Sequence, residues 1–129
     1  MFVYRIEDEE GVGMYWSKKI TAYTDDDYPV PIDEGKHPPP YRDSLINTQW
    51  SLMTLLEQKE YIFGFSSLGQ LRNWIYNNDW LMNLHAKGFV ISVFEIDEED
   101  VIKGYTQALF IRSKSISCCS YDIKEFFGL

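Results

Sequence analysis

The chain has 129 residues, of which 45% are hydrophobic and 16% aromatic, and this composition is typical of one ordered globular domain. Its formal net charge of −8 argues against a nucleic acid or an anionic membrane as a direct partner, because both bind basic surfaces. The two cysteines are adjacent (Cys118 and Cys119) and no run of 18 apolar residues occurs, so we expect a reducing, cytoplasmic location without a metal site or a membrane span.

The first predicted element is a strand at residues 2–6, where the side chains alternate between two faces. A turn with four acidic residues follows it. Residues 24–43 show no periodicity and contain the run His37-Pro-Pro-Pro-Tyr41. Because proline fixes φ and removes a backbone donor, we expect 24–43 to form a long surface loop within a single domain that spans 1–129.

Two helices are predicted in the middle of the chain. Residues 47–60 carry large apolar side chains at helical spacing, at Trp50, Met53 and Leu56, with Leu52 and Leu55 widening the same stripe. A second helix begins after Ser67, where Ser67 and Gln70 have the spacing of a capping box, and ends near Gly88. The sequence Asn77-Asn-Asp79 is a place where this helix can kink or split.

Strands dominate the last third of the chain. We expect them at 89–96, 106–111 and 116–121, followed by a short helix that Asp122 caps. Strands at both ends with helices between them favour an α+β domain with a mixed or antiparallel sheet and a central capped helix.

The candidate binding corner is the strand-to-helix junction at 61–67. A helix N-terminus leaves backbone N–H groups unpaired and carries partial positive charge, so Ser66 and Ser67 at this point are suited to an anionic or polar ligand group. The simpler interpretation is that both serines are turn and cap residues.

Four short segments together resemble the ADP-ribosyltransferase fold: Tyr4-Arg5 in the first strand, the Phe65-Ser-Ser67 corner, Val93-Phe-Glu-Ile96, and a late strand with Gln107. The resemblance implies that NAD is the cofactor. It further implies that Arg5, Ser66 and Ser67 hold NAD, with His37 in a loop that covers the cleft. The family has a catalytic Glu where this chain has Gln107, and Glu95 lies one element earlier. The resemblance therefore implies nucleotide binding with a degenerate catalytic site, at Gln107 and Glu95.

The chain also resembles a family of small acidic proteins from phages and prophages. The resemblance rests on Val3-Tyr-Arg-Ile-Glu7, a His-Pro-x-Pro loop, Phe63-Gly-Phe-Ser-Ser-Leu68 and the spacing Gly104-x-x-Gln-x-x-Phe110. It implies a mobile-element context, in which some proteins inhibit a host protein.

Two functional hypotheses from different classes follow, and the sequence leaves open whether the protein is an enzyme. The first is a nucleotide-binding or ADP-ribosyltransferase-like protein, in which four residues converge on a cleft: Arg5, Ser66, Ser67 and Gln107. Its structural alternative is that Arg5 pairs with a carboxylate such as Glu95. The second hypothesis is a non-catalytic protein that binds another protein through its acidic surface and exposed aromatic residues. The aromatic candidates are Tyr15, Trp16, Tyr28 and Tyr41.

Overall fold

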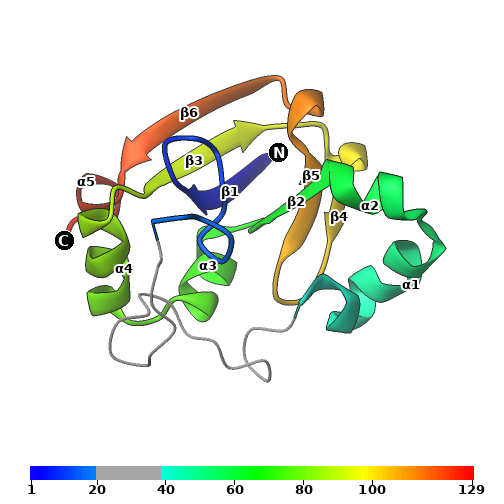
Figure 1. Cartoon of the computed structure of the whole chain (residues 1–129), viewed down its shortest axis with the longest axis horizontal. Helices are drawn as coiled ribbons and strands as arrows, with labels where there is room; N and C mark the ends of the chain where they lie inside the picture. Colours follow the sequence, from blue (N-terminus) through cyan, green and yellow to red (C-terminus); the bar gives the residue numbers. More distant parts are fainter. Residues whose placement is uncertain (20–38) are drawn as a thin grey trace.

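The computed structural model describes residues 1–19 and 39–129, which form an α+β domain with two small antiparallel sheets (Figure 1). Sheet A contains β1 (Phe2–Glu7), β3 (Val90–Glu95) and β6 (Ser117–Asp122), in the order β1-β3-β6. Sheet B contains β2 (Tyr61–Gly64), β4 (Val101–Lys103) and β5 (Ala108–Ile111), in the order β2-β5-β4. The α+β prediction is confirmed, and the sheets are antiparallel.

Four of the five described helices lie in two groups. In Figure 1, α4 and α5 lie at one end of the molecule, and α1 and α2 lie at the other end beside sheet B. The bounds of all five are α1 Ser44–Leu52, α2 Leu55–Glu60, α3 Leu68–Trp74, α4 Asn78–Ala86 and α5 Ile123–Phe127. Three short 3-10 turns complete the described elements: η1 Pro40–Arg42, η2 Glu98–Asp100 and η3 Arg112–Lys114.

The two faces of sheet A have different neighbours, because successive side chains of a strand point to opposite faces. One face carries Ile6 and Ile91, which pack with buried residues of α3, α4 and α5. The other face carries Val3 and Phe94, which pack against sheet B, where the ring of Phe94 lies 4.9 Å from that of Phe110. Sheet A is therefore the middle layer between sheet B and helices α3, α4 and α5.

A backbone bridge joins the two sheets. Tyr4 in β1 and Phe65, just after β2, exchange two N–H···O bonds of 2.8 and 2.7 Å. The approach is so close that a Cβ at Gly64 would lie 2.7 Å from the carbonyl oxygen of Tyr4. Only glycine fits there without a shift of the backbone. This bridge places the middle of β1 beside the strand-to-helix corner.

Both long predicted helices are divided in the structure. The predicted helix at 47–60 is wrong as a single element, because Thr54 and Glu57 form a capping box that starts α2 after α1 ends at Leu52. The helix after Ser67 splits where the sequence indicated, and Asn77 caps α4. Of the predicted loop, 24–38 lies outside the described residues, and 39–43 forms η1 and the N-cap of α1.

Candidate functional site

Arg5, the predicted cofactor-binding cation, lies in a buried network. Its Nε donates to the Glu7 carboxylate at 2.9 Å and its Nη1 donates to the carbonyl of Phe63 at 2.7 Å. The guanidinium also lies 5.6 Å from the centre of the Phe63 ring, and the Arg5 residue is only 5% exposed. Arg5 is a paired structural cation, as one interpretation of the sequence predicts, but its partner is not Glu95, which is exposed. Arg5 pairs with Glu7, two residues further along the same face of β1.

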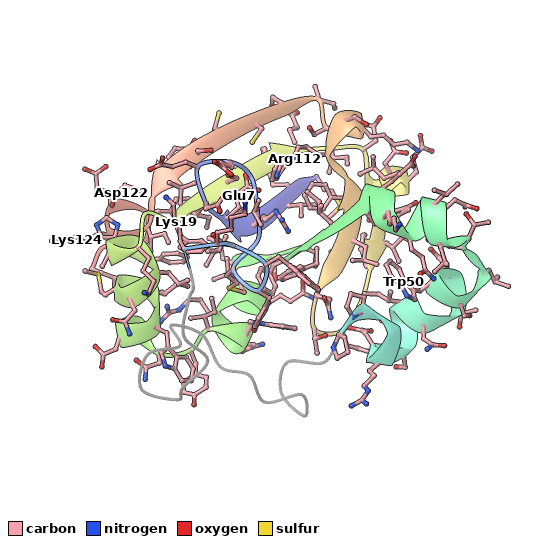
Figure 2. The ribbon with its side chains drawn as sticks, viewed as in Figure 1. Glu7, Lys19, Trp50, Arg112, Asp122 and Lys124 are labelled. Atoms are coloured by element: carbon pink, nitrogen blue, oxygen red, sulfur yellow. The ribbon has the colours of Figure 1, made fainter. Side chains whose placement is uncertain are left out.

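Glu7 is the centre of this network. Its carboxylate accepts from Arg5, from the Ser92 hydroxyl at 2.7 Å, and from Arg112, which comes from η3. Burial raises the pKa of Glu7, but the hydrogen bonds from Arg112 and Ser92 and the two arginine charges outweigh it, so the pKa lies below its ordinary value. Figure 2 shows Glu7 and Arg112 side by side. This network joins β1, β3 and η3.

Asp8 fixes the loop after β1. It accepts hydrogen bonds from the backbone N–H groups of Glu10 and Val12 and from the hydroxyl of Ser17. Only two of the four acidic residues at 7–10 are exposed, Glu9 and Glu10, because Glu7 and Asp8 are buried and hydrogen-bonded.

Ser66 and Ser67 form a cap that is tied to a neighbouring hairpin. The Ser67 hydroxyl accepts from the N–H of Gln70 at 3.0 Å, as the sequence predicts, but the Gln70 side chain accepts from Ser66 at 2.8 Å instead of completing the box on Ser67. The Gln70 amide then donates to the carbonyls of Gly104 and Tyr105. The corner is therefore bound to the turn between β4 and β5.

Gln107 is buried just before β5, and its backbone carbonyl accepts a hydrogen bond from the backbone N–H of Gly104 at 2.8 Å. The same turn is held by a residue that the sequence analysis missed, Asp43. Its carboxylate accepts from Leu45, Tyr105 and Thr106, so it caps α1 and fixes the β4–β5 turn together. The available signal was an Asp immediately before a helix.

Of the other two predicted site residues, only Glu95 lies in the described part of the chain, and it lies apart from this corner. Glu95 is exposed at the end of β3, opposite Phe2 and Ser117, and it accepts from the Ser117 hydroxyl at 3.2 Å. His37 lies outside the described residues. The Tyr4–Phe65 bridge thus brings the strand of Arg5 beside Ser66, and Gln70 ties that corner to the turn that contains Gln107. Glu95 lies in a different place.

A hollow of about 490 Å³ lies beside the Glu7 network. It is lined by the loop after β1 at 7–11, by Val90, by Arg112, and by Cys118 and Ser120 of β6. None of the predicted site residues in the described part of the chain lines it. Across residues 1–19 and 39–129, no three His, Cys, Asp or Glu side chains are grouped to hold a metal ion.

The α1–α2 unit carries an exposed apolar surface, which we call the leucine surface and define as Leu52, Leu55 and Leu56. These side chains are 82%, 76% and 77% exposed. The buried side of the unit is provided by α1, where Ile46 packs with Ile102 and Leu109 of sheet B. Helix α2 contains no buried residue and is held to α1 by a hydrogen bond from Gln58 to the carbonyl of Trp50.

The aromatic residues proposed as exposed differ in their exposure. Trp16 is 84% exposed, as the second hypothesis requires. Tyr15 instead packs on Phe63 and Trp74, and its hydroxyl accepts from the Trp74 indole N–H at 2.9 Å, so it belongs to the core. Tyr28 and the side chain of Tyr41 lie outside the described part of the chain.

Comparison with known proteins identifies a phage family. The family model described as Bacteriophage T4 Y00F protein matches residues 1–124. Neither the curated proteins nor the solved structures gave a match. In the described part of the chain, every helix is too short or too polar to traverse a lipid bilayer. The match covers nearly the whole sequence, and the chain belongs to the bacteriophage T4 Y00F protein family.

Proposed function

We propose that this phage protein is a non-catalytic binding protein that docks on a protein of the bacterial host through the leucine surface. The observation that carries the proposal is a helix, α2, that contributes no buried residue to its own domain yet presents Leu55 and Leu56 to solvent. Exposed apolar side chains gathered on one unit are typical of protein interaction sites. The feature of a partner protein that would fit this surface is an apolar groove.

Charge indicates the kind of protein that carries this groove. The chain has a net charge of −8, and α2 adds Glu57 and Glu60 next to the two leucines against a single Lys59. A basic rim around the partner's groove would be attracted to this field and would increase the association rate. We therefore expect a basic host protein whose association slows as salt concentration rises.

The test is capture from infected cells with the intact chain and with a Leu55→Gln/Leu56→Gln variant. Burial of a leucine is worth about 1.5–3 kcal/mol, so loss of two should weaken binding by roughly 100-fold or more. An Asn73→Ala variant, changed at another exposed position, is the control and should bind normally. Equal capture by all three chains would refute the proposal.

A second candidate is nucleotide binding, with NAD or ADP-ribose as the ligand. The observation that favours it is the Tyr4–Phe65 bridge, which brings the strand of Arg5 beside the Ser66–Ser67 corner. Binding requires the Arg5 guanidinium to exchange its contacts with Glu7 and with the Phe63 carbonyl for the ligand phosphates. With Gln107 in the place of a carboxylate, the chain would bind the nucleotide without transferring it. Titration calorimetry with NAD and with ADP-ribose tests this candidate function. If neither ligand gives a heat of binding, nucleotide binding is refuted.

A further inference from the structure

Among the described residues, strand β6 is an open edge of sheet A, since it pairs only with β3. The opposite edge strand, β1, is covered by its bridges to Phe65 and Gly13. All six residues of β6 are exposed, and in Figure 1 the strand forms the outer rim of the molecule. An edge strand of this length presents unpaired backbone groups to any extended chain.

The hydrogen-bond pattern identifies which groups are free. Tyr4 directs its N–H and C=O to Phe65, away from β3, so its register partner Val93 directs its own groups toward β6. Val93 pairs with Cys119. Because bonded and unbonded pairs alternate along an antiparallel ladder, Cys118 and Ser120 direct their N–H and C=O groups outward.

The hollow described above lies on the same face as the side chains of Cys118 and Ser120, which help to line it. Its other lining residues include the four acidic residues at 7–10 and one cation, Arg112. Arg112 shares the carboxylate of Glu7 with Arg5, and Lys19 lies 3.7 Å from Glu9, so three cations offset three of the four acidic charges. The side chain of Glu10 has no such cation near it in the described part of the chain. The hollow therefore keeps a net negative charge, at Glu10.

We infer that β6 binds an extended basic segment of a partner protein, which adds to sheet A as a fourth strand. Residues that pair directly with Cys118 and Ser120 have their side chains on the face of the hollow, so the segment carries Lys or Arg at alternate positions. The long stems of these residues cover the hollow while their charges reach Glu9 and Glu10. A second copy of this chain fits less well, because two chains of −8 repel each other. This surface is separate from the leucine surface, and the inference does not depend on it.

The test is selection of binders from a displayed library of random eight-residue peptides, with the full chain as bait. The selected peptides should carry Lys or Arg two residues apart, and amide hydrogen exchange should show new protection of the N–H groups of Cys118 and Ser120. A Glu9→Gln/Glu10→Gln variant should bind the selected peptides about fivefold or more weakly. The control is an Asp97→Asn/Glu99→Gln variant, which removes the same charge elsewhere and should bind them normally.

Several results would overturn the inference. They are peptides without basic residues, protection of amides away from β6, or equal binding by the two charge variants. Protection of Cys118 and Ser120 that grows with protein concentration in the absence of peptide would show that a second copy is the occupant, and would also overturn it. The Leu55→Gln/Leu56→Gln chain should retain peptide binding, which separates this inference from the proposed function.

Discussion

Neutralising Glu7 tests the buried network at its centre. Glu7→Gln keeps the shape of the side chain but leaves the guanidinium of Arg5, which is nearly inaccessible to solvent, without its carboxylate partner. Removal of one member of a buried ion pair typically costs 3–5 kcal/mol, because the other charge stays buried. Domains of this size have a free energy of unfolding of about 5–15 kcal/mol, so the variant should lose a large part of its stability.

Urea unfolding measures this cost, with the free energy taken by linear extrapolation. The matched control is Glu9→Gln on the same loop, whose side chain is 75% exposed and should change the free energy of unfolding by less than about 0.5 kcal/mol. An Arg5→Met/Glu7→Gln double variant should be more stable than Glu7→Gln alone, because the unpaired charge is gone. If Glu7→Gln is as stable as Glu9→Gln, the network does not hold the domain as we describe.

Three further predictions concern stability and follow from other contacts. Asp43→Ala removes the α1 cap and leaves donors of Tyr105 and Thr106 unpaired, so it should cost about 2–4 kcal/mol in urea unfolding, whereas Thr48→Ala, at an exposed position of α1, should change stability little. The pKa of Glu7 and that of Asp43 lie below their ordinary values because hydrogen bonds outweigh burial. The stability that these carboxylates contribute is therefore fully present above their unfolded pKa values of about 4 and is lost as the pH falls further. The melting temperature should fall with pH in this range, and it should fall less steeply in Glu7→Gln. Gly64→Ala should cost roughly 1–3 kcal/mol because its Cβ meets the Tyr4 carbonyl, while Gly69→Ala, which has space, should be neutral or stabilising by up to about 1 kcal/mol; equal melting temperatures would contradict the close approach of the sheets.

Local signals in the sequence predicted the ends of elements well. Asp122 caps α5 and Gly128 ends it with φ of 65°, and Ser67 caps α3, because a cap needs only residues a few positions apart. The α1–α2 boundary carries such a signal too, in Thr54 and Glu57, but the apolar spacing of 47–60 continues across it and favours one helix. Leu52 and Leu55 were predicted to widen the apolar stripe of one helix, and the structure places them on either side of the break, both exposed.

The candidate site depends on contacts that a single sequence does not specify. Glu7 lies two residues from Arg5, yet its burial follows from Arg112 and Ser92, which the fold brings from more than 80 positions away. The acidic run at 7–10 therefore gave no sign that half of it is buried. In contrast, the approach of Arg5 to the Ser66 corner was expected, and the Tyr4–Phe65 bridge places their strands together.

Site-specific photo-cross-linking tests the proposed binding surface most directly. The intact chain would carry benzoylphenylalanine at position 55 in one version and, as a reference, at the exposed position 124 in another, and both would be irradiated in infected cells. We predict one discrete adduct with a basic host protein from position 55 and none of that adduct from position 124. The same adducts from both positions, or none from position 55, would contradict a docking role for the leucine surface.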